Sequence, residues 1–173
     1  MLESRRKYEG FHSKSNQNLP EEFGCILKMK VLITGVSGFV GSYLLKQLVK
    51  EAKHEIAVIV REPLNAWRIQ SSLKHIYVIK GSIADPESYR ARFSAFKPDV
   101  VIHLAWDGVG SQSRNESAQW RNVPYMLELM EIAISNGAHT FIGLGSQAEY
   151  GSVNARIDEN QATNPTTLYG VSK

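Results

Sequence analysis

The chain alternates short runs of apolar residues with longer segments in which apolar residues recur at helical spacing. The apolar runs predict five strands, at residues 31–33, 56–60, 76–79, 100–105 and 139–144. Helical patterns cover about 39–52, a short stretch after Pro86, and about 115–136. Strands and helices that alternate at this spacing predict an α/β protein with a doubly wound parallel sheet.

Each expected helix has one apolar stripe that would face the sheet. The stripes are Val40, Leu44 and Leu48; Tyr89, Phe93 and Phe96; and Val123, Leu127, Met130 and Ile134. Gly137 is placed to cap the long helix, and Pro165 is placed to start a further helix that reaches Lys173.

Residues 1–28 are polar, mixed in charge and without a period, so we expect a flexible extension ahead of one domain at 29–173. Met29 lies just before the first strand and is an alternative start of translation. With 173 residues and 43% hydrophobic content, the chain can bury one core but hardly two.

The net charge of +3 comes from Lys and Arg residues that are scattered among acids, which argues against a nucleic-acid partner. The single cysteine, Cys25, excludes an internal disulfide. No apolar run is long enough to cross a bilayer and no signal segment is visible, so we expect no membrane partner and a cytoplasmic location. No spacing of His, Cys, Asp and Glu indicates a metal site.

Residues 30–41 place a glycine-rich turn between the first strand and the first helix. Gly35 permits a tight turn, Gly38 lets the backbone approach a pyrophosphate, and Gly41 lets the helix lie close to the strand. Free amides at the helix start would face the phosphates. Glycine turns of this kind also occur without a ligand, so the interpretation depends on the rest of the chain.

Tyr169 and Lys173 lie four residues apart and share one helix face. A neighbouring ammonium favours the ionised form of a phenol, so such a tyrosine can give a proton to a carbonyl oxygen or take one from an alcohol as hydride moves. Ser146, just after the fifth strand, could hydrogen-bond the same oxygen. The sequence therefore indicates a dehydrogenase type of site.

Together these segments resemble the extended short-chain dehydrogenase/reductases, also called the NAD-dependent epimerase/dehydratase family. The resemblance covers residues 30–173. The matching motifs are Thr34-Gly35-x-x-Gly38-x-x-Gly41, His103-Leu104-Ala105, Asn122 in the long helix, Ser146 five residues before Gly151 of the Tyr150-Gly151 pair, and Pro165-x-x-x-Tyr169-x-x-x-Lys173.

The resemblance implies an NAD(P)-binding Rossmann fold that acts on a nucleotide-sugar substrate, with Ser146, Tyr169 and Lys173 as catalytic residues. Lys173 would also hold the nicotinamide ribose. The expected cofactor contacts are Gly35, Ser37, Gly38, Phe39, Val40, Gly41, Arg61, Ser82, Ile83, Leu104, Ala105, Trp106, Asn122, Tyr169 and Lys173. Family members often pair through the long helix and the tyrosine-bearing helix, so a homodimer of the full-length enzyme is expected. They also continue beyond that helix, so we expect domain 29–173 to be incomplete at its C-terminal end, without the last strands and the substrate-binding segment, and inactive alone.

Two positions depart from the family pattern. Ser82 stands where the family commonly has an Asp that contacts adenine, and a hydroxyl is the weaker acceptor. Gln147 and Ala148 follow Ser146 where the 4,6-dehydratases have Asp-Glu, which argues against dehydration because neither residue can move a proton. The segment 145–151 and Leu104-Ala105-Trp106 look most like ketoreductases of the CDP-abequose synthase type. The first interpretation is therefore a 4-keto-sugar reductase.

Arg61 follows the second strand, where an acid would bind the adenosine ribose and repel a 2′-phosphate. A guanidinium attracts that phosphate, so we predict NADP, with NAD as the alternative. An NAD-dependent nucleotide-sugar 4-epimerase and a non-catalytic nucleotide-binding module remain as alternative functions. His103 lies in an apolar strand and is interpreted as a core histidine.

Overall fold

The computed structural model describes residues 28–154 and 156–173. The predicted flexible extension, apart from Lys28, lies outside the described residues. Within them, no helix is both long enough and apolar enough to pass through a membrane.

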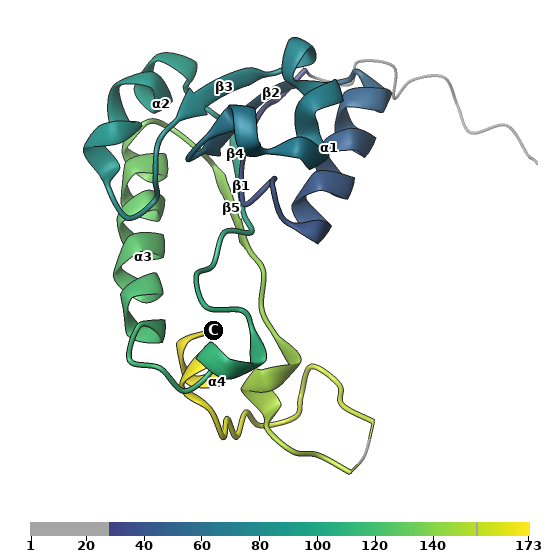
Figure 1. Cartoon of the computed structure of the whole chain (residues 1–173), viewed down its shortest axis with the longest axis vertical. Helices are drawn as coiled ribbons and strands as arrows, with labels where there is room; N and C mark the ends of the chain where they lie inside the picture. The colour runs from purple at the N-terminus through teal and green to yellow at the C-terminus, as the bar shows by residue number, and fades with distance from the viewer. Residues whose placement is uncertain (1–27, 155) are drawn as a thin grey trace, which may run out of the picture.

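Five parallel strands form one sheet in the order β3-β2-β1-β4-β5 (Figure 1). They are β1 (Lys30–Thr34), β2 (Glu55–Val60), β3 (Tyr77–Lys80), β4 (Val100–His103) and β5 (Thr140–Gly143). The first strand pairs with β2 on one side and with β4 on the other, so that Thr34 lies opposite both Ile59 and His103. This arrangement confirms the predicted doubly wound sheet, and the winding reverses direction beside β1.

Alternate residues of the strands build two cores, one on each face of the sheet. Helix α1 (Phe39–Glu51) and the 3-10 helix η3 (Trp67–His75) pack on the face that holds Val31 and Ile33. Helices α2 (Arg90–Phe96) and α3 (Gln119–Ser135) pack on the face that holds Leu32. Figure 1 shows α1 and α3 on opposite sides of the sheet. The described residues also form four short 3-10 helices: η2 (Pro63–Asn65), η4 (Pro86–Ser88), η5 (Ser111–Ser113) and η6 (Gln147–Tyr150).

Two of the three predicted helix faces need correction. The prediction for α2 is confirmed, since Tyr89 and Phe93 are fully buried and Phe96 packs beside them. In α1, Leu44 and Leu48 of the predicted stripe do pack against the core, but Val40 is 52% exposed and the fully buried apolar side chain is that of Leu45.

The predicted core stripe of α3 is wrong. Leu129, Ile132 and Ala133 are buried against the sheet, while Leu127 is 43% and Ile134 63% exposed. The helix is apolar on two sides, and its periodicity alone does not tell which side meets the sheet. Gly137 follows the C-cap residue Asn136 and adopts a φ of +89°, in agreement with its predicted role at the end of α3.

The tyrosine-bearing helix α4 (Leu168–Ser172) begins three residues later than predicted. Thr167, rather than Pro165, starts it, because the Thr167 hydroxyl accepts a hydrogen bond from Gly170 N at 3.0 Å. Helix α4 packs against α3 and η6. In Figure 1, α4 and η6 form a lobe below the sheet, beside the N-terminal end of α3.

Candidate functional site

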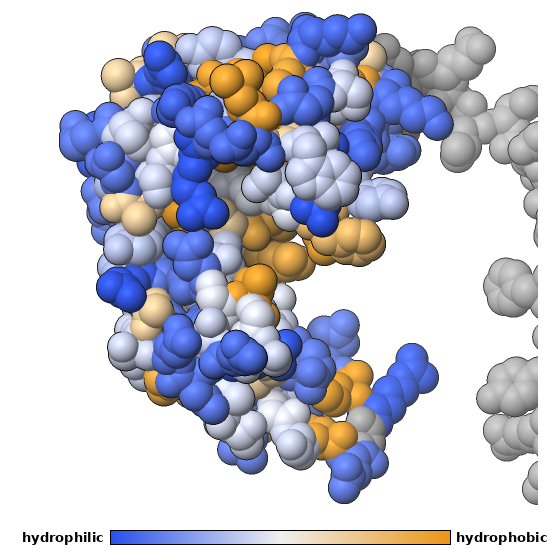
Figure 2. All heavy atoms as spheres, in the orientation of Figure 1, coloured by the Kyte–Doolittle hydropathy of each residue, from blue (hydrophilic) through white to orange (hydrophobic). Residues whose placement is uncertain are grey.

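A cleft of about 360 Å³ opens where β1, β2 and β4 end. It brings together the predicted cofactor contacts Gly35, Ser37, Gly38, Phe39, Val40, Gly41, Arg61, Ser82, Ile83, Leu104, Ala105 and Trp106. Sequence reasoning missed Thr34, Ile59, Val60, Gly81, Asp107, Val109 and Leu144, which also line it. Most of these residues lie at or next to the end of a predicted strand, and in such sheets the strand ends are where ligands bind, so this position could have identified them. Figure 2 shows a hollow between the sheet and the lobe of α4, with hydrophobic side chains on its inner wall.

The glycine turn shapes one wall of the cleft. Gly35 has a φ of +73°, and a Cβ there would come within 2.5 Å of the Leu104 carbonyl carbon. A Cβ on Gly41 would collide with the Gly35 carbonyl oxygen. Gly38 N donates to Gly35 O at 3.1 Å, and α1 starts at Phe39 without a side-chain cap. The first amides of α1 therefore remain available to an anion in the cleft.

A buried polar contact ties the ends of β1 and β4 together. The Thr34 hydroxyl oxygen lies 2.9 Å from His103 Nδ1 and accepts hydrogen bonds from the backbone N–H groups of Leu104 and Ala105, both at 3.2 Å. Burial, with a smaller contribution from the positive charge of Lys173, lowers the pKa of His103 to about 4. The neutral ring agrees with the interpretation of His103 as a core histidine.

Two amide side chains of α3 hold the loop that follows β4. Asn122 Oδ1 accepts from Asp107 N at 2.9 Å, and its Nδ2 donates to Asp107 O at 3.1 Å. Gln119 Oε1 accepts from the Trp106 indole at 2.8 Å, and its Nε2 donates to Gly108 O at 2.7 Å. Asn122 therefore lies behind the loop and outside the cleft lining, whereas it was expected among the cofactor contacts. Gln119 has no counterpart in the sequence-based expectations.

Two arginines lie at the β2 side of the cleft. Arg61 is exposed, and its Nη1 lies 3.8 Å from Asp107 Oδ1. Arg68 donates from Nη1 to the Ser37 carbonyl oxygen at 3.3 Å. Sequence reasoning missed Arg68, because no helix was predicted for the segment that carries it. The predicted contact Ser82 lines the cleft, and its hydroxyl accepts a bond from Ala84 N at 3.3 Å.

The three expected catalytic residues gather outside the cleft lining. Ser146 caps η6, where its hydroxyl accepts from Ala148 N at 3.2 Å and its own N–H bonds to the Glu149 carboxylate. A Cβ on Gly170 of α4 would collide with the Ala148 carbonyl oxygen, so α4 lies directly on η6. This contact brings Tyr169 and Lys173 to the same lobe as Ser146.

Trp106 contacts both the tyrosine and the lysine. Its ring meets the Tyr169 ring edge to face, with centroids 6.2 Å apart. The Lys173 ammonium lies 4.1 Å from the Trp106 ring centroid and 5.9 Å from the Tyr169 ring centroid. Partial burial lowers the pKa of Lys173, while the nearby Glu149 carboxylate raises it. The ammonium thus lies nearer to the indole than to the phenol ring that the sequence paired it with.

Within residues 28–154 and 156–173, no three His, Cys, Asp or Glu side chains come together as metal ligands. The cleft instead combines a glycine turn, an uncapped helix start and a crevice where the sheet reverses its winding. These features define the class of dinucleotide-binding α/β proteins.

The chain belongs to the NAD dependent epimerase/dehydratase family, whose model matches residues 31–173. This match confirms the family resemblance of the motifs. The chain is 27% identical over 162 residues to a protein of Bacillus subtilis described as an uncharacterized UDP-glucose epimerase, YtcB, and the match covers 84% of this chain and 48% of that protein.

Solved structures give the same picture. The UDP-Glc/GlcNAc 4-epimerase of Campylobacter jejuni superposes with a TM-score of 0.74 at 25% identity, over 84% of this chain and 46% of that one. The Bordetella bronchiseptica enzyme WbmG, solved in complex with NAD and UDP, gives a TM-score of 0.68 at 26% identity, over 84% of this chain and 47% of that one. The chain thus spans about half the length of these relatives. A particular nearness to CDP-abequose synthases is not shown by them.

Proposed function

We propose that the protein binds a nicotinamide dinucleotide in the cleft and acts by hydride transfer on a nucleotide-activated sugar. The observation that carries the proposal is the uncapped start of α1 behind the Gly35 turn, at the point where the winding of the sheet reverses. Partial positive charge on these amides suits a pyrophosphate. The relatives described as nucleotide-sugar epimerases support the substrate class.

The residues of the cleft fit such a cofactor. The amides of Phe39, Val40 and Gly41 would hold the pyrophosphate, and the half-exposed side chains of Ile83 and Leu104 offer apolar contacts to flat rings. When bound, the nicotinamide would supply the hydride donor or acceptor. The chain itself supplies the binding surface and the proton-transfer groups.

Proton transfer is assigned to Tyr169, assisted by Ser146. The Ser146 hydroxyl accepts a hydrogen bond from Ala148 N, which leaves its own hydrogen free to donate. Donation to the sugar oxygen would stabilise negative charge that develops there. Tyr169 would give or take the proton of that oxygen, and Lys173 would supply positive charge beside it. Gln147 and Ala148 offer no second proton-transfer group, which argues against dehydration.

A 4-epimerase is the preferred form of this function. The sequence-based first interpretation was a 4-keto-sugar reductase, but the relatives named above include a UDP-Glc/GlcNAc 4-epimerase. The two reactions differ in their cofactor balance, since epimerisation returns the cofactor to its starting redox state and ketone reduction consumes it. Product formation without net oxidation of reduced cofactor therefore identifies the epimerase.

NADP is proposed as the preferred cofactor because of the charges past β2. Arg61 lines the cleft and Arg68 reaches the Ser37 backbone. Glu62, which follows Arg61 in the chain, is paired with Lys80 at 2.9 Å and lies outside the cleft lining. Asp107, by contrast, is in the lining, where its carboxylate lies 3.8 Å from the Arg61 guanidinium and is itself exposed. Two guanidinium groups favour a 2′-phosphate. WbmG was solved with NAD, so the two cofactors must be compared directly on this chain.

A homodimer through α3 is also proposed. Trp120, Leu127 and Ile134 follow one another at intervals of seven residues and are all exposed. Residues at this spacing lie on one face of a helix. Burial of that face against a second copy would remove the apolar surface from water.

The proposed function is tested by titrating the purified protein with NADH and with NADPH, followed by fluorescence. The folded protein is expected to bind at least one of them, and G35V is expected to lose binding because its side chain would meet the Leu104 backbone. A panel of nucleotide sugars is then incubated with the protein and its cofactor, and the sugars are separated by chromatography. The proposal is contradicted if the folded protein binds neither NADH nor NADPH.

A further inference from the structure

Trp106 is the residue shared by the cleft and the tyrosine–lysine pair. It lines the cleft just after β4, while Ser146, Tyr169 and Lys173 lie outside the lining. Its ring is half-buried and contacts both Tyr169 and Lys173. The position of the pair relative to the cleft therefore depends on how this ring is held.

The indole is anchored from behind. Its N–H donates to Gln119 Oε1 at 2.8 Å, and Gln119 is fully buried. The Gln119 amide nitrogen donates to Gly108 O at 2.7 Å and to Ser113 O at 2.9 Å. Because both N–H groups of the amide donate and its oxygen accepts from the indole, Gln119 has one preferred orientation, and it fixes the plane of the indole.

The fixed ring offers its face to a cation. Lys173 Nζ lies 4.1 Å from the ring centroid, well within the range of a cation–π contact. Indole is the strongest of the side-chain rings in this interaction, and partial burial of the lysine increases its value. The edge-to-face contact at 89° places Tyr169 against the same ring.

Other charged and titratable groups surround the lysine. Glu149 of η6 attracts the ammonium, and His103 of β4 senses its charge. Tyr169 lies on the same helix, and the Arg114 guanidinium is 5.4 Å from the Tyr169 ring on the loop before α3. Of the two aromatic rings in cation–π contact with the Lys173 ammonium within the described part of the chain, Trp106 at 4.1 Å is closer than Tyr169 at 5.9 Å.

We infer that Trp106 is a positioning residue, which holds the Lys173 ammonium on its ring face and Tyr169 at its edge and so sets where this pair stands beside the cleft. The inference rests on the proposed function for its catalytic meaning. Loss of the ring would leave Lys173 free to sample other positions, so the effect should fall on turnover rather than on substrate binding.

The test uses NMR of isotope-labelled lysine side chains in the whole chain. Protons over an indole face are shifted upfield, so the Lys173 ε-methylene signal is expected upfield of the other lysines and is identified by its loss in K173R. W106L is expected to abolish the shift, and W106F to retain a smaller one. W67L, which removes an exposed tryptophan of η3, is the matched control and should leave the signal unchanged.

A Lys173 signal without an upfield shift in the wild type, or one that W106L leaves in place, overturns the inference. The wild-type spectrum and W106F keep the test valid if W106L does not fold. Where the protein turns over a nucleotide sugar, W106L is expected to lower kcat more than it raises KM, and W106F to restore part of kcat. Cofactor titration of the same samples tests the proposed function separately, because the ring-current shift needs no bound nucleotide.

Discussion

Arg61 and Asp107 approach each other from opposite sides of β1, with Nη1 of the arginine 3.8 Å from Oδ1 of the aspartate. Both residues line the cleft. Their side chains are 76% and 67% exposed, so the pair is screened by solvent and contributes at most about 1 kcal/mol. Its importance is for selectivity, because the aspartate competes with a ligand phosphate for the arginine.

D107N is expected to tighten NADPH binding by up to about fivefold, the affinity equivalent of a surface ion pair. R61A is expected to weaken NADPH binding roughly tenfold or more, since a charge-assisted bond to phosphate is lost. NADH affinity should change little in either variant, because NADH has no 2′-phosphate. Fluorescence titration measures all four constants. R121A, an exposed arginine of α3, is the control, and equal effects of R61A on both cofactors would contradict the assignment.

The glycine turn predicts a graded series of stabilities. G35A combines a positive φ with a Cβ 2.5 Å from the Leu104 carbonyl carbon, so it is expected to cost roughly 2–4 kcal/mol of unfolding free energy. G137A shares the positive φ but meets no atom within 4 Å, so only about 1 kcal/mol is expected. G110A has neither feature and should be near neutral. Urea unfolding measures the three values, and a G35A no worse than G137A would show that the turn is not packed as described.

His103 makes stability depend on pH. Its pKa is about 4 in the folded protein and about 6.5 when unfolded, so between these values the unfolded chain binds more protons. This contribution is fully present above pH 6.5 and is lost as the pH falls toward 4, with a total of about 3 kcal/mol. H103N, which cannot titrate, should flatten this part of the stability curve. Unfolding midpoints across the range are the measurement, and an unchanged slope in H103N would place the dependence elsewhere.

The exposed stripe of α3 predicts the behaviour of the chain in solution. L127E places a charge in the centre of the stripe and is expected to shift a dimer to monomer, because burying an unpaired carboxylate is costly. L64E is the matched control, since Leu64 is 83% exposed on η2 and away from α3. Sedimentation equilibrium gives the two masses. A monomeric wild type would remove the case for a dimer through this face.

The doubly wound parallel sheet could be predicted from the chain because a short run of apolar residues lies at the centre of each strand and helical patterns separate the runs. Most of the cleft residues were also predicted, since they lie at or just beyond the ends of those runs. The face of α3 could not be predicted, because Leu127 and Ile134 are as apolar as Leu129 and Ile132 and the choice between them depends on what the helix contacts. The contacts of Lys173 also depend on tertiary structure, as Trp106 lies 67 positions earlier in the chain.

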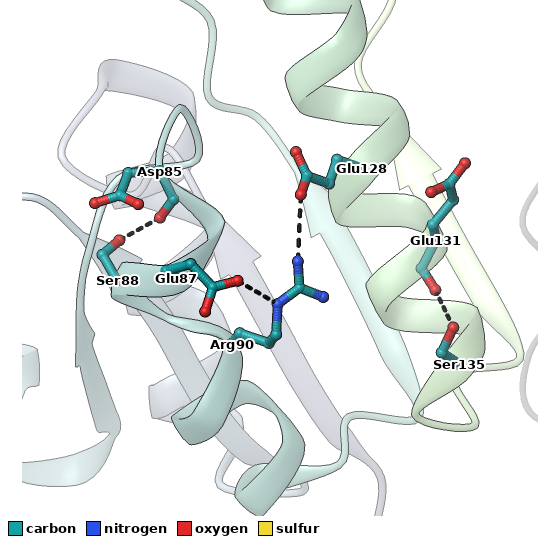
Figure 3. Close-up of polar contacts among 7 residues, drawn as sticks. All are labelled: Asp85, Glu87, Ser88, Arg90, Glu128, Glu131 and Ser135. Carbon is teal, nitrogen blue, oxygen red and sulfur yellow. Dashed lines mark hydrogen bonds and ion pairs between the residues drawn. The ribbon is translucent and has the colours of Figure 1, made fainter.

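The contacts of Arg90 show the same dependence on tertiary structure. Figure 3 shows Arg90 between Glu87 and Glu128, at 2.9 and 3.3 Å, so that the start of α2 is bound to the middle of α3. The first pair follows from local spacing along the chain. The second joins residues 38 positions apart, and only the packing of both helices on one face of the sheet brings them together.

Gln119 and Asn122 both form hydrogen bonds from α3 to the loop after β4. Because their carboxamides bind the main chain at Asp107 and Gly108, we expect that wall of the cleft to move together with α3. A tilt or translation of the helix would therefore move Trp106 and Asp107 with it. The width of the cleft would then change through the position of α3, without a rearrangement of the residues that line the cleft.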